Sequence, residues 1–379
     1  MELCLYYFNN AATSYPKPPA VADAVAKCLS SIPHTPYREA GAEVAPFWEC
    51  REHIASFFGS TKPERVILTS GATASLNMLI NGLIRPGSHI ITSQAEHNSV
   101  LRPLQLAAWS NSAQVTCLRC GELGAVDPEL VGRSICSDTS LVVLNHTSNV
   151  TGYVQDLKAI YSQCARRGVP LVIDAAQFSG STPVLLDEMP LAAVVFAGHK
   201  GLGGPGGVGG FVLGSDLSPA PWLVGGTGIL SELQEMPKAL PLRYEPGVPN
   251  DAGMAGLTAA CRELRSFGPA KASEHLNGLV ATLRERLADC PSIRWYAAGY
   301  NPSGIASFTV KGWDVRDLGY VLENSFGCLV RTGLHCAPLL HSTLGTYPQG
   351  TIRVSFSRFT TVDELELLIK AIREIGKLV

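Results

Sequence analysis

The chain has 379 residues, of which 46% are hydrophobic and 16% charged, and its formal net charge at pH 7 is −2. This length and hydrophobic content can fill a large core, so we expect two domains. No cluster of Lys and Arg indicates nucleic-acid binding or a membrane surface, and no apolar stretch reaches the roughly 20 residues of a membrane helix. The composition therefore favours a small molecule or another protein as the partner.

Short β-branched runs, separated by segments long enough for helices, follow one another from about Val66 onward. This alternation predicts an α/β fold with a mainly parallel sheet. The runs are apolar at almost every position, so we expect strands that are covered on both faces. They are RVILTS (65–70), HIITS (89–93), QVTCLR (114–119), LVVLN (141–145), LVIDA (171–175) and AAVVFAG (192–198).

The pattern changes after about Pro249, where two helical segments (255–268 and 272–290) precede two strand-like segments, IASFTV (305–310) and CLVRTG (328–333). Near the end, Thr361 and Glu364 form a capping box ahead of an apolar stripe, which predicts a packed last helix. We therefore expect a large α/β domain and a smaller α+β domain, the latter joined by the N-terminal residues. The expected bounds are 16–250 for the larger domain and 251–379 with 1–15 for the smaller.

Four polar residues follow the strand-like runs: His97, Asn149, Asp174 and Lys200. In an open parallel sheet, ligands bind beyond the carboxyl ends of the strands, where these residues would converge. Asp174 stands 26 positions before Lys200, room for one crossover, so the two should be neighbours. They could form a simple buried ion pair. They could also serve pyridoxal phosphate, with Lys200 as the Schiff-base amine and Asp174 keeping the ring nitrogen protonated.

A phosphate site is predicted in LTSGATASLN, where Ser70 and Gly71 follow a strand and Thr73 starts a helix. Backbone N–H groups and a hydroxyl would face an anion at the positive helix end. The alternative is a plain strand-to-helix turn. His97 could stack on the pyridine ring. The sequon Asn145 to Thr147 is interpreted as ordinary backbone.

Two other motifs carry less weight. Gly201, Gly203 and Gly206 match the dinucleotide-binding G-x-G-x-x-G, but another strand follows them instead of a helix, and no acidic residue stands about 20 positions later. Cys117 and Cys120 form a lone C-x-x-C without a second pair, so no metal site is expected. The eleven scattered cysteines and the start MELCLYYFNN, which lacks the parts of a signal peptide, favour a cytoplasmic protein.

Ten stretches between Tyr7 and Thr361 match one family in family order. They are YFNNAATSYPKP, TSGATASLN, AEHNS, TSNVTG, VIDAAQ, GHKGLGGPGGVG, GGTG, RYEPGVPN, RTGLHCAP and TIRVSFSRFTT. The chain thereby resembles the class V aminotransferase family of fold-type I pyridoxal-phosphate enzymes, within the cysteine desulfurase and selenocysteine lyase group. The resemblance implies a fold-type I architecture, pyridoxal 5'-phosphate as cofactor, and a homodimer with a shared active site.

The resemblance also implies residue roles. Lys200 would bind the cofactor covalently, Asp174 would pair with the ring nitrogen, Gln177 would donate to the ring hydroxyl, and Thr227 would reach the phosphate of the other subunit. The full set of implied cofactor contacts is Gly71, Ala72, Thr73, His97, Asn149, Asp174, Gln177, His199, Lys200 and Thr227.

For the substrate, the resemblance implies a carboxylate clamp at Arg353, with Asn149, Arg331 and Ala12 as further contacts. Cys336 matches the persulfide-forming cysteine, while Lys200 and His97 are the other implied catalytic residues. We expect positive charge on Arg331 and on His335 to favour the Cys336 thiolate.

Two positions depart from the family pattern. Ala197 stands where a hydroxyl is common, and Leu334 replaces a frequent histidine.

The sequence thus predicts a desulfurase that converts L-cysteine to L-alanine, with a sulfur-acceptor protein as a further partner. Two alternatives stay open within the family, selenocysteine lyase and a C–S lyase that eliminates pyruvate and ammonia from cystine or a related thio-amino acid. A nicotinamide oxidoreductase that uses the glycine loop is the alternative from another class.

Overall fold

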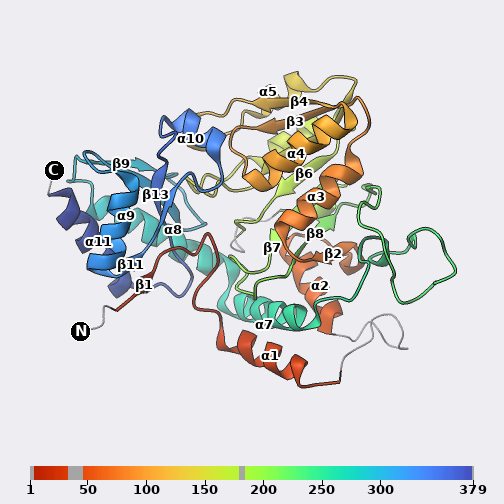
Figure 1. Cartoon of the computed structure of the whole chain (residues 1–379), viewed down its shortest axis with the longest axis horizontal. Helices are drawn as coiled ribbons and strands as arrows, with labels where there is room; N and C mark the ends of the chain where they lie inside the picture. Colours follow the sequence, from red (N-terminus) through yellow and green to blue (C-terminus); the bar gives the residue numbers. More distant parts are fainter. Residues whose placement is uncertain (1–3, 33–45, 179–183, 378–379) are drawn as a thin grey trace.

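The computed structural model describes residues 4–32, 46–178 and 184–377 (Figure 1). Its strands are β1 (Tyr6–Tyr7), β2 (Val66–Thr69), β3 (His89–Ser93), β4 (Gln114–Leu118), β5 (Thr139–Asn145), β6 (Leu171–Asp174), β7 (Ala192–Ala197), β8 (Gly209–Leu213), β9 (Ile293–Tyr296), β10 (Ile305–Val310), β11 (Cys328–Leu329), β12 (Arg331–Gly333) and β13 (Thr351–Ser355). Its α-helices are α1 (Pro19–Leu29), α2 (Pro46–Phe57), α3 (Ala72–Leu83), α4 (Asn98–Asn111), α5 (Pro128–Ser134), α6 (Leu157–Ala165), α7 (Asp251–Phe267), α8 (Pro269–Arg286), α9 (Val315–Phe326), α10 (Pro338–Leu344) and α11 (Val362–Gly376). Short 3₁₀ helices are η2 (Pro63–Arg65), η3 (Glu122–Gly124), η4 (Leu186–Glu188) and η5 (Leu242–Tyr244).

Seven of the described strands form the larger sheet, in the order β2-β8-β7-β6-β5-β3-β4. Strands β3 to β7 pair in parallel, whereas β8 runs antiparallel to both of its neighbours. Successive side chains of a strand point to opposite faces. In β5, Leu141 and Val143 join the core on one face, and Val142 and Leu144 join the core on the other. The expected α/β fold with a mainly parallel sheet is confirmed.

Helices cover both faces of this sheet (Figure 1). Helices α3 and α4 pack on one face, and α2, α5, α6 and α7 pack on the other. The prediction that every strand is covered on both sides is wrong for β4, where Gln114, Val115 and Cys117 are exposed. The reason is its place at the sheet edge, beside β3 alone. No helix in the described part of the chain combines the length and the apolar content needed to cross a bilayer.

A second sheet contains β12, β13, β10 and β9 in that order, with antiparallel pairing throughout. Its core is shared with α8, α9 and α11 and with Phe8 of the N-terminal segment. Strand β1 pairs in parallel with β11, and Asn9 bridges to Ser355 of β13. The N-terminal segment is therefore fastened to this second unit. At the other end of the chain, the predicted capping box of Thr361 and Glu364 begins α11.

Two details differ from the sequence expectations. The segment 328–333 is two strands, because β11 pairs with β1 while β12 pairs with β13. Helix α7, which falls in the expected smaller domain, packs against α1 and α2 and contributes Met254 and Leu257 to the core of the larger sheet. This packing favours a division of the chain near Gly268, between α7 and α8, and we propose it in place of residue 250.

Candidate active site

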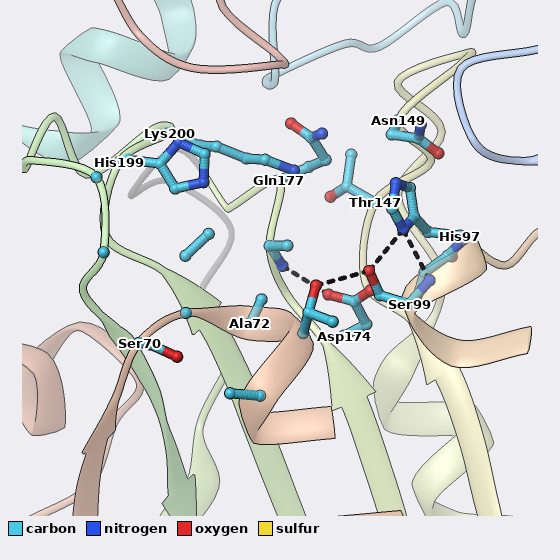
Figure 2. A pocket seen from close by; sticks show the side chains of 18 residues that line it. Ser70, Ala72, His97, Ser99, Thr147, Asn149, Asp174, Gln177, His199 and Lys200 are labelled. Carbon is cyan, nitrogen blue, oxygen red and sulfur yellow. Dashed lines mark hydrogen bonds between the residues drawn. The ribbon is translucent and has the colours of Figure 1, made fainter. Parts of the chain in front are cut away.

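A cavity of about 300 Å³ lies at the carboxyl ends of β5, β6 and β7 (Figure 2). Side chains from distant parts of the sequence meet there because parallel strands end at the same edge of the sheet. Every predicted cofactor contact except Thr227 lines this cavity: Gly71, Ala72, Thr73, His97, Asn149, Asp174, Gln177, His199 and Lys200.

One wall of the cavity is the N-terminus of α3. Gly71 precedes the helix with φ 146°, a conformation that favours glycine, and no side chain caps this helix end. A Cβ on Gly71 would meet no heavy atom within 4 Å, so the space beside it is open. Thr73 contributes a hydroxyl, held 2.9 Å from the Ser99 hydroxyl. The first turn of α3 therefore presents backbone N–H groups and a hydroxyl to an anion.

Asp174 and Lys200 occupy the interior of the cavity. Asp174 ends β6 and is buried, and its Oδ1 accepts a hydrogen bond from the Ala176 N–H at 3.0 Å. Burial raises the pKa of Asp174, and the charge of Lys200 opposes that change. Burial lowers the pKa of Lys200 to about 8, against the opposing effect of Asp174. Lys200 can therefore lose its proton near neutral pH, as a nucleophilic amine must.

Two histidines of the cavity are neutral at pH 7. His97 caps α4, where its Nδ1 accepts a hydrogen bond from the Ser99 N–H at 3.0 Å. This contact leaves the ring proton on Nε2. Burial, with the charge of Lys200 as the next cause, lowers the pKa of both His97 and His199 to about 4. Neither ring therefore adds positive charge beside the amine.

The loop after β12 carries Cys336, which is not among the residues that line the cavity, although Asn149 of the lining is bonded to this loop. Its backbone is held by two hydrogen bonds of 2.7 Å, from Asn149 Nδ2 to the His335 carbonyl and from the Asn98 N–H to the Cys336 carbonyl. His335 and Cys336 have φ of 49° and 61°, which non-glycine residues seldom adopt. Arg331 Nη2 donates a hydrogen bond to the Cys336 sulfur at 3.3 Å.

The expectation that His335 adds positive charge beside Cys336 is wrong. Its side chain is buried, and Nε2 donates to the Thr351 carbonyl at 3.1 Å. Burial lowers the pKa of His335 well below its usual value, so the ring is neutral. Among these expected neighbours, Arg331 alone supplies a charge.

Arg353 is only 1% exposed and faces Arg331 across the β12–β13 pair. Its Nη1 donates to the Asn149 carbonyl at 3.0 Å and its Nη2 to Asn9 Oδ1 at 3.1 Å, while Nε has no hydrogen-bond partner. Burial, followed by the charge of Arg331, lowers the pKa of Arg353 to about 9. Arg353 forms no ion pair with any residue that the structure describes. Such a buried cation suits an anionic ligand.

Of the remaining predicted residues, Thr227 and Ala12 lie outside the lining of this cavity, and Gln177 lines it but has a further partner. Thr227 lines a neighbouring cavity of about 710 Å³, away from Lys200 of its own chain. Ala12 lies in the N-terminal segment, where its N–H donates to the Asn9 carbonyl at 3.0 Å. Gln177 lines the Lys200 cavity, but its Nε2 donates to the Ala11 carbonyl at 3.0 Å.

The sequence analysis missed three polar residues of the cavity: Ser99, Asn145 and Thr147. Ser99 lies two residues after His97, and its hydroxyl joins Thr73 to His97. The sequence analysis interpreted Asn145 and Thr147 as ordinary backbone, and it therefore did not assign them to the site. Their position at the end of β5, beside Asp174 in the neighbouring strand, was the signal that could have identified them.

These residues fit pyridoxal phosphate, the cofactor that the resemblance implies. Lys200 offers an amine that deprotonates readily, and Asp174 a buried carboxyl next to it in the same cavity. The uncapped start of α3, with open space at Gly71, can receive the phosphate. Ala197 lines the cavity without a hydroxyl, so the phosphate would depend on the α3 backbone, Thr73 and neighbouring groups.

Comparison with known proteins agrees with this geometry. Residues 6–368 match the family model of the class-V aminotransferases. The chain is 29% identical to cysteine desulfurase CsdA of Escherichia coli, over 97% of this chain and 92% of the relative, and the solved structure of CsdA superposes with a TM-score of 0.87 at 28% identity, over 98% and 95% of the two chains. A cysteine desulfurase of Thermococcus onnurineus superposes with a TM-score of 0.89 at 27% identity, over 99% of this chain and 95% of the other.

A probable cysteine desulfurase of Mycolicibacterium paratuberculosis is 28% identical over 98% of this chain, which spans 56% of that longer relative. The match to the family model covers nearly the whole chain and includes the residues that build the cavity. The chain therefore belongs to the class-V aminotransferase family.

Proposed function

We propose that this protein is an enzyme, a pyridoxal-phosphate-dependent cysteine desulfurase that converts L-cysteine to L-alanine and carries the sulfur as a persulfide on Cys336. The observation that carries the proposal is the attachment of the Cys336 loop to the cavity that holds Lys200. Asn149 lines that cavity and also binds the carbonyl next to Cys336, and Arg331 lies 3.3 Å from the sulfur. The names of the relatives support the same reaction.

The residues of the cavity would divide the binding of the cofactor. Lys200 would hold its aldehyde carbon and Asp174 its ring nitrogen, while Thr73 and the α3 backbone would hold the phosphate. His97 and Gln177 would contact the ring, and His199 the phosphate. When bound, the cofactor supplies an electron-withdrawing ring that stabilises negative charge on the substrate's α-carbon.

The chain's own groups would then carry out the reaction on cysteine. Arg353 would bind the substrate carboxylate, and the Lys200 amine, released when the substrate's amino group takes its place, would take the α-proton. The Cys336 thiolate attacks the substrate sulfur, so an S–S bond forms and the C–S bond breaks. The electron pair of the broken bond stays on carbon, which takes a proton and becomes the methyl group of alanine.

A second copy of the chain is the partner that we propose for the loop around Thr227. This loop exposes a set of large apolar side chains, which a partner surface would cover: Trp222, Leu223, Val224, Leu230, Leu233 and Val248. A shared active site would place Thr227 at the phosphate of the other subunit. All eleven cysteines are free thiols, which supports a reducing cytoplasm as the location. A thiol-bearing acceptor protein would take the sulfur.

Substitution of the cysteine tests the proposal. The Cys336→Ala variant should lose sulfide and alanine production from cysteine while it keeps the cofactor absorbance of the unchanged protein. Cys136→Ala, at an exposed cysteine just before the amino end of β5 and so at the end of the strand away from the cavity, is the control and should retain full activity. Undiminished turnover by Cys336→Ala would refute the role of this thiol. Pyruvate and ammonia as products would instead identify a β-eliminating lyase.

A further inference from the structure

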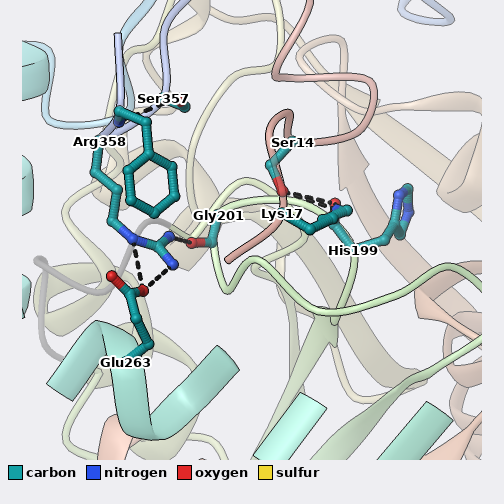
Figure 3. Close-up of polar contacts among 8 residues, drawn as sticks. Ser14, Lys17, His199, Gly201, Glu263, Ser357 and Arg358 are labelled. Carbon is teal, nitrogen blue, oxygen red and sulfur yellow. Dashed lines mark hydrogen bonds and ion pairs between the residues drawn. The ribbon is translucent and has the colours of Figure 1, made fainter. Parts of the chain in front are cut away.

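The N-terminal segment crosses the loop that carries Lys200 and binds it at one carbonyl oxygen (Figure 3). Four donors of this segment converge on the carbonyl of His199, the residue directly before Lys200. They are Ser14 N at 3.0 Å, Ser14 Oγ at 3.2 Å, Thr13 Oγ1 at 3.2 Å and Lys17 Nζ at 2.7 Å. The Lys17 bond is the shortest of the four and the only one from a cation, and charged donors make the stronger hydrogen bonds.

The carbonyl of Gly201, the residue directly after Lys200, is held from the other end of the chain. Arg358 Nη1 donates to it at 3.4 Å, and an ion pair with Glu263 of α7 fixes the guanidinium (Figure 3). The carbonyls of the two residues that flank Lys200 therefore accept hydrogen bonds from cationic side chains, while the Lys200 carbonyl accepts one from the Gly203 N–H at 2.8 Å. Because these two side chains come from opposite ends of the chain, the conformation of the loop depends on the tertiary structure.

The burial and the hydrogen-bond partners of Lys17 differ from those of an ordinary exposed lysine. Its side chain is partly buried and forms no ion pair with a described residue. Its ammonium binds neutral oxygens, the Ser14 hydroxyl at 2.9 Å and the His199 carbonyl. Burial, with the charge of Arg358 as a second cause, lowers the pKa of Lys17 to about 8. Holding this cation without a carboxylate is unfavourable for folding alone, which points to a role in positioning.

We propose that Lys17 is a positioning residue for Lys200, because its bond to the His199 carbonyl fixes the peptide that directs the Lys200 side chain into the cavity. This inference rests on one part of the proposed function, namely that Lys200 binds the cofactor. Lys17 itself does not line the cavity and contacts no reacting atom.

The test uses three variants of the full-length protein. Lys17→Met keeps the length of the side chain and removes its donors, Lys17→Arg restores a cationic donor, and Lys27→Met on α1 is the matched control at an exposed lysine. Three measurements are made on each variant. They are amide hydrogen exchange of residues 198–204, the pH titration of the cofactor absorbance, and kcat and KM for cysteine.

A hydrogen bond from a charged group contributes about 1.5–3 kcal/mol, which corresponds to roughly a 10- to 150-fold effect. Lys17→Met should therefore speed exchange in 198–204 by about tenfold or more and shift the pH midpoint of the absorbance. It should lower kcat by roughly 10- to 100-fold and change KM less than about threefold. Lys17→Arg should restore most of each property, and Lys27→Met should match the unchanged protein.

The inference would be overturned if Lys17→Met had the same amide hydrogen exchange rates in residues 198–204 and the same pH midpoint of the cofactor absorbance as the unchanged protein. Equal defects in Lys17→Arg and Lys17→Met would also overturn it, since a donor cation would then not matter. The proposed function fails separately, if borohydride reduction of the unchanged protein leaves no pyridoxyl group on Lys200. Hydrogen exchange still tests the contact between Lys17 and the loop in that case, because it needs no turnover.

Discussion

The substitution Arg353→Met should separate substrate binding from stability. Burial lowers the pKa of Arg353 from 12.5 to about 9. At about 1.4 kcal/mol per pKa unit, the folded protein disfavours the charged guanidinium by on the order of 5 kcal/mol. Because the folded pKa is the lower one, this cost is complete below pH 9 and declines as the pH rises toward 12.5.

The hydrogen bonds of Arg353 oppose this cost. Its bonds to the Asn149 carbonyl and to Asn9 contribute about 1.5–3 kcal/mol each, or roughly 3–6 kcal/mol together. The two effects nearly cancel, so methionine, an uncharged side chain that fills part of the same space, should change the free energy of unfolding by less than about 2 kcal/mol at pH 7.5. The loss of the carboxylate clamp should lower kcat/KM for cysteine at least about 100-fold.

Urea unfolding of the full chain and steady-state alanine production measure the two effects. Arg353→Lys, which keeps the charge but not the planar fork, should fall between the unchanged protein and Arg353→Met in kcat/KM. A loss of more than about 4 kcal/mol in Arg353→Met would show that the buried cation stabilises the fold, and would refute the reasoning. A kcat/KM within about threefold of the unchanged protein would remove Arg353 from the substrate site.

Two further predictions concern Lys200 and the last helix. The pKa of Lys200 is lowered to about 8, so the fraction of Lys200 in the neutral amine form increases between pH 7 and pH 9. Pyridoxal phosphate should therefore attach to cofactor-free protein faster at pH 9 than at pH 7. An attachment rate, followed by absorbance, that does not change with pH would contradict this. Thr361→Ala removes the side-chain cap of α11 and should lower the free energy of unfolding by about 1 kcal/mol, and coincident urea curves would show that the cap contributes nothing.

Local sequence predicted the elements that local chemistry controls. Apart from β4, the apolar β-branched runs became buried strands, and Thr361 with Glu364 began α11 as a capping box. The cavity residues at strand ends were predictable because parallel strands share one carboxyl edge. Strand β4 was assigned buried faces in error, because an apolar run does not say whether its strand lies at the edge or in the centre of a sheet.

The contacts around the reactive groups depended on long-range folding. Nothing adjacent to His335 in the sequence says that its ring is buried against Thr351, so its neutral state came from the tertiary structure. The same holds for Lys17, which meets the His199 carbonyl 182 positions away.

The sequence by itself therefore determined the family, the α/β architecture and the residue types that can bind a phosphorylated aldehyde, because these follow from local patterns and motifs. Only the tertiary structure decided which cations lack a carboxylate partner and which backbone groups hold the Lys200 and Cys336 loops. Burial and hydrogen bonding between distant segments set those properties, and no local pattern encodes them.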